Sequence, residues 1–184
     1  MDYKEVKAAP AKERILQALE ELLQCGQLDD IHVSDLIRLA GVSRKTFYRH
    51  FQDKYDLVNC YFRRFYQDTF EQVTAGAQWD EALYRYLMIC GEKAEVLRHA
   101  YSSHDANCLR KYDIEMTEKT YRNYLTLKGA DVGAREMDFA VRIASCGGTD
   151  MVIGWLMSGM REEKEVIVSL IKRTLPGDIL KYLQ

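Results

Sequence analysis

Proline is nearly absent from this chain of 184 residues, whose two prolines, Pro10 and Pro176, lie close to its ends. Proline interrupts helices and sheets alike, so the long stretch between these two positions is free of such breaks. The alternation of β-branched and polar residues that marks strands is missing as well. Together these absences predict an all-α fold.

Long apolar runs are absent too. No stretch approaches the roughly 20 apolar residues that a transmembrane helix requires, and residues 1–5 are charged where a secretory signal would be apolar. We therefore expect a cytoplasmic protein without a membrane segment. The five cysteines lie far apart and form no C-x-x-C pair, which argues against a disulfide framework or a zinc module.

The motifs of common catalytic sites are also missing. There is no phosphate-binding loop, no G-x-S-x-G nucleophile elbow and no H-E-x-x-H zinc motif. His104 and Cys108 are four residues apart, with His99 nearby, but isolated pairs of this kind are usually coincidental. We expect no enzyme activity, no bound metal and no cofactor.

Net charge is small, because 26 basic residues are balanced by 28 acidic ones to leave −2. The distribution is uneven, however. Between Arg38 and Lys54 five basic residues accompany a single acid, Asp53, so this segment carries a charge of +4. Such a basic stripe is what phosphate binding requires, although on its own it could be an ordinary solvated helix face.

Apolar residues recur at helical spacing over most of the chain. They predict N-terminal helices at residues 11–25 (ended by Gly26), 33–40, 44–51 and 53–70, the last closed by residues 74–77. About five further helices follow from Trp79, two of them at residues 136–159 and 162–173, with loops near 102–105, 128–131 and 158–159. We expect two domains, residues 1–54 and 55–184.

Residues 40–47 have the features of a tight turn between two helices. Ala40 is small enough to let the helices approach, and Gly41 tolerates the positive φ that the turn demands. We expect Val42 to fill the corner and Ser43 to cap the second helix with its hydroxyl, while Phe47 returns a ring to the core. The pattern predicts a helix-turn-helix, whose second helix enters the major groove of DNA.

The exposed positions of that second helix carry donors long enough to reach bases and phosphates: Arg44, Lys45, Thr46, Tyr48, Arg49 and His50. The stretch from residue 33 to 57, with its run Thr-Phe-Tyr-x-His-Phe-x-x-Lys, closely resembles the DNA-binding domain of the tetracycline-repressor (TetR) family. The match spans about residues 11–58. It implies a three-helix DNA-binding head joined to a larger helical body.

The resemblance also implies roles for individual residues. In the family, phosphates are commonly contacted from the positions of Tyr48, His50 and Lys54. Base edges are usually reached from residues 44–46, with help from Ser34 in the preceding helix. The DNA-binding set predicted here is Ser34, Ser43, Arg44, Lys45, Thr46, Tyr48, Arg49, His50 and Lys54.

One position departs from the family pattern. Where the family usually has Ser or Thr to cap the helix at 33–40, this chain has His32. We therefore expect Ser34 to cap that helix and to begin it later. Asp35 suits a helix N-terminus but would sit poorly against a phosphate.

The last two long helices predict a dimer. Gly147 and Gly148 cost roughly 1 kcal/mol each inside a helix, a cost that often accompanies the close approach of another backbone. In the TetR family these helices form a four-helix bundle with those of a second chain, and residues 153–160 resemble the DhaS-like subgroup. We predict a homodimer interface at Gly148, Val152, Trp155, Leu156, Ile167 and Leu170. The alternative is that these helices pack only within the chain.

Between residues 61 and 124 the chain is rich in tyrosine. In the TetR family the middle helices surround an effector pocket, and aromatic walls with polar tips suit a small amphipathic ligand. The residues predicted to bind it are Tyr66, Phe70, Tyr84, Tyr101, Tyr112 and Tyr121. The alternative for each of them is ordinary core packing.

These observations predict a sequence-specific regulator that binds a double-stranded DNA operator as a homodimer, most simply a repressor released by a small effector. A second hypothesis is a TetR-like coactivator controlled by a partner protein, with no small-molecule effector. A third is a small-ligand binding protein that has lost its operator, against which the retained Lys45, Tyr48, His50 and Lys54 argue.

Overall fold

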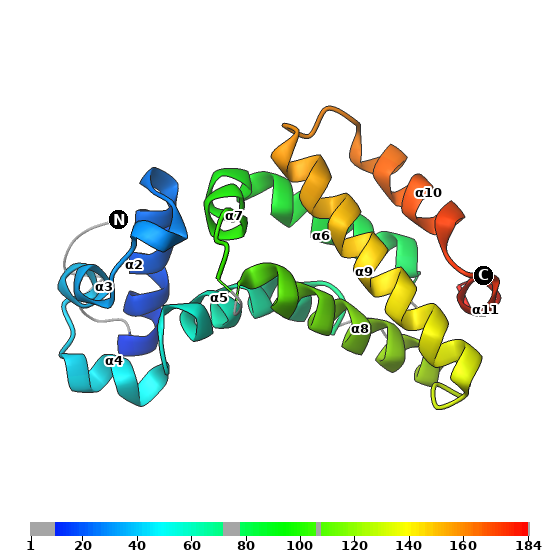
Figure 1. Cartoon of the computed structure of the whole chain (residues 1–184), viewed down its shortest axis with the longest axis horizontal. Helices are drawn as coiled ribbons and strands as arrows, with labels where there is room; N and C mark the ends of the chain where they lie inside the picture. The colour runs from blue at the N-terminus through cyan, green and yellow to red at the C-terminus, as the bar shows by residue number, and fades with distance from the viewer. Residues whose placement is uncertain (1–9, 72–77, 106–107, 184) are drawn as a thin grey trace. The chain divides into compact units, whose positions relative to one another are not determined.

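The computed structural model describes residues 10–71, 78–105 and 108–183 of the chain. Within these ranges every regular element is a helix, so the predicted all-α fold is confirmed (Figure 1). The helices form two compact units, one comprising residues 1–62 and 95–109 and the other residues 63–94 and 110–184. The division between the units falls after residue 62, and the predicted domain boundary after residue 54 stays a prediction.

The first unit contains the predicted N-terminal helices. Helix α2 (Ala11–Cys25) buries residues spaced four apart, Ile15, Leu19 and Leu23, and ends at Gly26 as predicted. A 3-10 turn, η1 (Leu28–Asp30), follows it. Helices α3 (Val33–Ala40) and α4 (Arg44–His50) both pack against α2, and α7 (Ala94–Tyr101) lies almost wholly in this unit (Figure 1).

The start of α3 differs from the prediction. The helix begins at Val33 with His32 as its N-cap residue, and no side chain caps it. Ser34 lies exposed in the first turn, so the prediction that Ser34 caps the helix is wrong. Asp35 instead pairs with Arg38 one turn later, at 3.0 Å. The start of this helix follows its apolar residues and not a capping side chain, because Val33 and Leu36 both lie on its inner face.

Helix α5 (Lys54–Asp68) supplies residues to both units. Its start agrees with the predicted long helix, but its helical hydrogen bonding ends at Asp68, before Phe70. The predicted closure of this helix at residues 74–77 lies outside the described residues.

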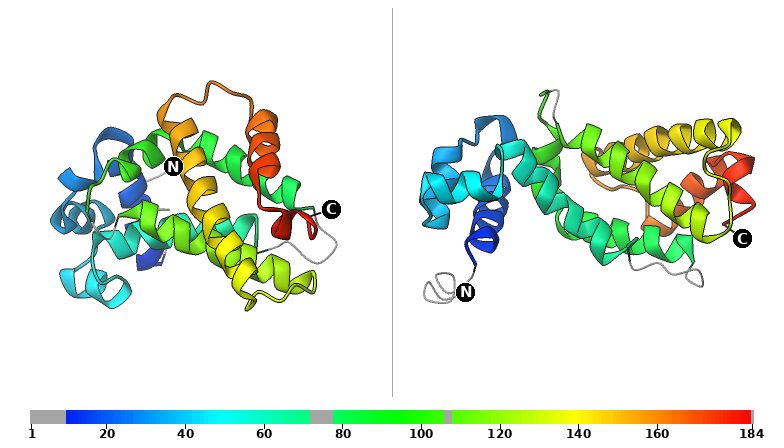
Figure 2. Two further views of the ribbon diagram at one scale, coloured as in Figure 1. Left: turned by 45° about the vertical axis from the view of Figure 1, so that its right-hand side comes forward. Right: turned by 90° about the horizontal axis from the view of Figure 1, so that it is seen from below.

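The second unit is a layered bundle of helices. It contains α6 (Trp79–Glu92), α8 (Leu109–Leu127), α9 (Arg135–Met157), α10 (Lys164–Thr174) and the short α11 (Gly177–Leu180). Helix α10 packs on α6 and α9, while α11 packs on α9. Figures 1 and 2 show α9 running beside both α8 and α10. The loops predicted near residues 128–131 and 158–159 separate these helices, as expected.

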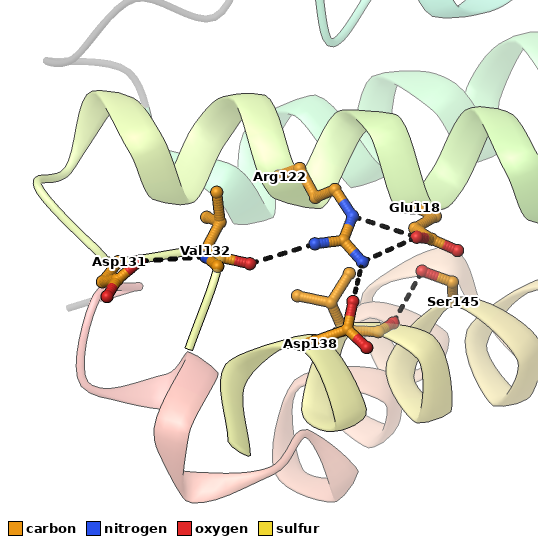
Figure 3. Close-up of polar contacts among 8 residues, drawn as sticks. Glu118, Arg122, Asp131, Val132, Asp138 and Ser145 are labelled. Atoms are coloured by element: carbon orange, nitrogen blue, oxygen red, sulfur yellow. Dashed lines mark hydrogen bonds and ion pairs between the residues drawn. The ribbon is translucent and has the colours of Figure 1, made fainter. Parts of the chain in front are cut away.

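A polar clamp joins α8 to the start of α9 (Figure 3). The Arg122 guanidinium donates to Glu118 of its own helix at 2.8 and 2.9 Å, to the Val132 carbonyl at 3.1 Å, and to Asp138 of α9. Hydrogen bonds from Arg122 to Asp138 and Glu118 raise the pKa of the guanidinium, which keeps it charged. The clamp fixes the connection between the two helices.

In the described part of the chain, no helix combines the length and the apolar character needed to span a bilayer.

Candidate functional site

The turn between α3 and α4 has the predicted geometry. Gly41 adopts a φ of +61°, a left-handed conformation that residues other than glycine rarely adopt. Its N–H donates to the Arg38 carbonyl, and the Val42 N–H donates to the Ile37 carbonyl at 3.2 Å. Arg14 of α2 donates to the Gly41 carbonyl at 3.3 Å. These bonds close the end of α3 and fix the point from which α4 departs.

Ser43 caps α4, which confirms the prediction for this residue. Its Oγ accepts the Thr46 backbone N–H at 3.1 Å, and the two side-chain hydroxyls lie 2.9 Å apart. A cap of this kind satisfies an N–H that the first helical turn leaves free. The Thr46 hydroxyl is therefore already engaged within the head, and its side chain is half-buried.

The two faces of α4 have opposite character. Phe47 is fully buried and lies 5.8 Å from the buried Phe51, measured between ring centroids. The other face is exposed and contains no acidic residue; its exposed side chains are Arg44, Lys45, Tyr48, Arg49 and His50. Ser34 is exposed on α3. The structure therefore presents the predicted basic and aromatic side chains on the exposed face of one short helix.

Tyr48 is oriented by its neighbours on that helix. The Arg44 guanidinium lies 5.5 Å from the centre of the Tyr48 ring, and the ring meets Phe47 edge-on at 5.3 Å. A cation over an aromatic face is stabilised electrostatically. The contact pre-organises both side chains on the exposed face.

Lys54 has a different setting from the other predicted DNA contacts. Its ammonium donates to the backbone carbonyls of Leu28, Asp29 and Ile31 at 2.7, 3.0 and 3.0 Å. An ammonium has three N–H donors, and these three carbonyls account for all of them. In this structure Lys54 therefore ties η1 to the start of α5, and its contact with a phosphate stays a prediction.

A small cavity of about 40 Å3 lies within the second unit. Three of the six residues predicted to bind an effector line it: Tyr66, Phe70 and Tyr121. The other three do not. Tyr101 packs against Phe62 in the first unit, at 5.8 Å between ring centroids. Tyr84 faces Glu165, whose hydrogen bond raises the pKa of the tyrosine, and Tyr112 is half-buried elsewhere on α8.

The prediction missed several residues of the cavity wall. Trp79 and Tyr86 come from α6, while Asp113, Thr117 and Tyr121 recur every four residues along α8. Residues four apart share one face of a helix, so the last three could have been grouped from the sequence.

Asp113 anchors a buried hydrogen-bond network. The Tyr66 hydroxyl donates to Asp113 Oδ1 and lies 2.8 Å from the Thr117 hydroxyl, and the Tyr86 hydroxyl donates to the same carboxyl oxygen at 3.4 Å. Thr149 of α9 extends the network to Thr117 at 3.2 Å. Burial, and then the charge of Asp113, raise the pKa of Tyr66 well above its ordinary value, so the hydroxyl remains a donor.

Most residues predicted for a dimer interface face the interior of the second unit. Val152, Trp155, Leu156 and Ile167 are buried, so their side chains cannot meet a second chain in this fold. Gly148 is half-buried and lines the cavity, and Leu170 alone of the six is exposed. The side chains assigned to an interface therefore have to be revised.

A second apolar face on the same helices is open. Its large side chains, which we name the exposed apolar stripe, are Phe139, Ile143, Met151 and Met157 on α9 with Val166 and Leu170 on α10. A Cβ added at Gly147 or Gly154, which lie between them on α9, would meet nothing within 4 Å. The described part of the chain thus gives no close contact that explains these glycines.

The described residues contain no group of three or more His, Cys, Asp or Glu side chains placed to hold a metal ion. His99 Nδ1 donates to the Leu23 carbonyl at 2.6 Å, which gives this histidine a structural partner in the first unit.

Family models match both parts of the chain. The model described as "Bacterial regulatory proteins, tetR family" matches residues 15–60, and the model described as "Transcriptional regulator C-terminal region" matches residues 77–177, more than half of the chain. No curated protein matches it significantly.

Solved structures share the fold at low sequence identity. The chain is similar to the dihydroxyacetone kinase operon activator DhaS, with 18% identity, a TM-score of 0.66 and coverage of 90% of this chain and 93% of that chain. A tetR-family regulator from Streptomyces coelicolor is 16% identical, with a TM-score of 0.60 and coverage of 88% of this chain and 79% of that chain. FadR from Bacillus subtilis, solved in complex with stearoyl-CoA, is 16% identical, with a TM-score of 0.54 and coverage of 90% of this chain and 98% of that chain. Similarity at this level shows a common fold.

Proposed function

The chain belongs to the tetR family of bacterial regulatory proteins, which are DNA-binding transcription factors and not enzymes, and we propose that it binds a specific operator as a homodimer. The observation that carries the proposal is the exposed face of α4. This face presents three cations, a histidine and a tyrosine on a helix that follows a capped, glycine-closed turn. Since bacterial operators lie in the cytoplasm, we assign the protein to that compartment.

The roles of the α4 residues follow from their positions. Arg44 and Lys45, in the exposed first turn, reach base edges in the major groove, where Arg and Lys favour guanine. Tyr48, Arg49 and His50 neutralise or hydrogen-bond phosphates and set the register. The DNA bases are read next to Ser43 and Thr46 at the capped start of α4. Ser34 of α3 contacts the DNA backbone beside them. Lys54 supports the head from within.

The homodimer places the exposed apolar stripe against the same stripe of a second chain. Monomeric proteins rarely leave large contiguous apolar patches in water, and a twofold axis lets one self-complementary patch serve both chains. The open glycines on α9 allow the two backbones to approach closely. A dimer of this kind sets two recognition helices into successive major grooves, about 34–36 Å apart.

Control by a small effector is the second part of the proposal. An effector can switch the protein only if it binds the two conformations with different affinity. Helix α5 contains both Lys54, tied to the head, and Tyr66, which lines the cavity. A ligand that displaces Tyr66 would act on the helix that holds the head, and repression would end when the operator is released.

A partner protein is the alternative controller. The cavity, at about 40 Å3, is far smaller than the roughly 300–1,000 Å3 of ordinary ligand pockets, so an effector of common size does not fit it as it stands. The structural similarity to an operon activator, DhaS, favours activation over repression within this alternative.

The test is a footprint of the purified full-length protein on the DNA upstream of its own gene. We expect one protected palindrome, bound by a dimer and released at high salt because phosphate contacts release counterions. Protection that is absent or independent of sequence would contradict the proposal. Repeating the footprint with small metabolites and with lysate proteins separates the two modes of control.

A further inference from the structure

Tyr48 connects the buried side of α4 to its exposed side. Its ring meets the ring of Phe47 edge-on, with 5.3 Å between the centroids. Phe47 is 0% exposed and packs on Phe51, whereas Tyr48 is 46% exposed. One neighbour of the tyrosine ring is therefore fixed in the core of the head, while nearly half of the tyrosine remains open to solvent.

Arg44 lies one turn before Tyr48 on the same helix. Residues four apart are neighbours on a helix surface, and the guanidinium carbon of Arg44 lies over the Tyr48 ring, 5.5 Å from its centroid. This distance is within the roughly 6 Å at which a cation is attracted to a ring face. Arginine suits such stacking because its guanidinium is flat and weakly hydrated. The contact restrains a long side chain that would otherwise sample many conformations in water.

The exposed arginine of α3 is held in a different way. Arg38 pairs with the carboxylate of Asp35 at 3.0 Å, which cancels its charge and occupies N–H donors. A tyrosine ring has no net charge, so Arg44 keeps its full positive charge. Helix α4 also contains no acidic residue that could bind the guanidinium. Arg44 is thus a restrained guanidinium that retains its charge and its capacity to donate hydrogen bonds.

We propose that Tyr48 is a positioning residue for base recognition: its ring holds the Arg44 guanidinium for two parallel hydrogen bonds to O6 and N7 of one guanine. Guanine presents two acceptors side by side in the major groove, and the fork of an arginine matches them. Ordering the side chain before binding lowers the entropy that binding costs. The inference rests on the proposed function, since it assigns a base to the helix that is proposed to enter the major groove.

The ring of Tyr48 and its hydroxyl then have separate roles. A hydroxyl that contacts a phosphate adds affinity for any DNA, because phosphates carry no sequence information. A ring that positions Arg44 adds affinity only where the guanine is present. The quantity that distinguishes the two roles is the ratio of affinities for two operators that differ in one acceptor atom of that guanine.

The experiment uses the full-length protein and the operator that footprinting defines. Each guanine of a half-site, together with its symmetry mate, is replaced in turn by 7-deazaguanine, which lacks the N7 acceptor and keeps its Watson–Crick pairing. Anisotropy titrations at low salt, where weakened variants still bind, measure the loss of affinity at each position. We expect a position at which the loss is about fivefold or more and at which it disappears in Arg44→Ala. The absence of such a position, or a loss that disappears in Lys45→Ala instead, would overturn the proposal.

Two variants of Tyr48 are then titrated on the operator pair that differs at this position. Tyr48→Phe keeps the ring and should leave the ratio of the two affinities unchanged, even if both affinities fall. Tyr48→Leu removes the ring, and we expect the ratio to decrease about threefold, in line with an exposed cation–ring contact. His50→Leu, at another exposed position of α4, is the matched control and should leave the ratio unchanged.

A ratio that survives Tyr48→Leu, or that decreases equally in Tyr48→Phe, contradicts a positioning role for the ring. Thermal unfolding of each variant shows whether the head is intact. Should Tyr48→Leu destabilise it, Tyr48→Gln, which also lacks a ring and suits an exposed helical position, must show the same decrease.

The inference and the proposed function fail in different ways. If the unmodified protein binds no DNA sequence specifically, the proposed function is refuted and the inference with it. If it binds an operator specifically but no guanine depends on Arg44 and the Tyr48 ring, the inference alone is refuted and the function remains.

Discussion

The ammonium nitrogen of Lys54 lies 2.7 Å from the carbonyl oxygen of Leu28, a residue 26 positions earlier in the chain. Two more carbonyls, of Asp29 and Ile31, accept the other hydrogen bonds of this ammonium. One side chain at the start of α5 thus satisfies three backbone acceptors of the segment that connects α2 to α3. The Leu28 carbonyl also accepts the Ile31 N–H at 3.2 Å, but the carbonyls of Asp29 and Ile31 would lose a charge-assisted hydrogen bond without the ammonium, which is costly, so the lysine stabilises the head.

This relationship predicts the effect of Lys54→Met, which keeps the aliphatic stem and removes the three donors. We expect the free energy of unfolding of the head to fall by roughly 2–3 kcal/mol, as for hydrogen bonds to a charged group. Urea unfolding followed by circular dichroism measures this change. Lys12→Met, at an exposed position of α2, is the control. An unchanged stability with a reduced salt dependence of DNA binding would restore Lys54 to the phosphate contacts.

Lys45→Ala should weaken DNA binding without affecting stability. Because Lys45 is exposed on the first turn of α4, we expect operator affinity to fall by about 1–3 kcal/mol and the preference over random DNA to decrease. Anisotropy titrations on both DNAs measure this. Lys111→Ala, an exposed lysine on α8, is the control and should leave both affinities unchanged; equal losses in the two variants would refute a specific role for α4.

Arg122→Gln tests the clamp between α8 and α9. The substitution keeps a polar side chain but removes the charge that joins Glu118 to Asp138. We expect the free energy of unfolding of the second unit to fall by about 1–2 kcal/mol, while the affinity of the intact head for DNA changes little at dimer-saturating concentrations. An unchanged thermal unfolding midpoint would show that water replaces the hydrogen bonds of Arg122 without loss of stability.

The DNA-binding head could be predicted from the sequence because its determinants are local. Gly41 and Ser43 act on residues within a few positions, and the structure has the positive φ and the cap hydrogen bond that their side chains require. The role of Lys54 could not be predicted in this way. Its carbonyl partners are backbone groups more than 20 residues away, and a backbone group has no signature in the sequence.

The body was predicted less completely for a related reason. Helix α9 has two apolar faces, and periodicity identifies both without showing which faces the core. Leu156 is 0% exposed whereas Ile143 is 52% exposed, so four of the six residues assigned to an interface were core residues. The cavity likewise depends on which tyrosines meet in space: Tyr66 and Tyr121 do, while Tyr101 belongs to the first unit.

Ile143→Asp should disrupt the proposed homodimer. A charge in the middle of the exposed apolar stripe would be buried unpaired in the dimer, which is strongly unfavourable, yet it remains solvated in the monomer. We expect sedimentation to show folded monomers with much weaker operator binding. Leu156→Asp is the contrasting variant, since burial of that side chain predicts loss of folding. A folded, dimeric Ile143→Asp protein would place the interface elsewhere.

Thiol labelling provides the last prediction, because three cysteines lie in three settings. Cys25 and Cys146 are exposed, whereas Cys90 is buried, and burial raises the pKa of the Cys90 thiol. Since the thiolate is the reactive form, Cys90 should stay unlabelled in the native protein.

Cys146 follows Ile143 by three residues on α9 and shares its face, so a dimer should shield it as protein concentration rises, while Cys25 reacts at a constant rate. Mass spectrometry of maleimide-treated protein measures the rates, and Ile143→Asp should return Cys146 to fast labelling at every concentration. A Cys146 rate that never depends on concentration in the unmodified protein would rule out this face as the interface.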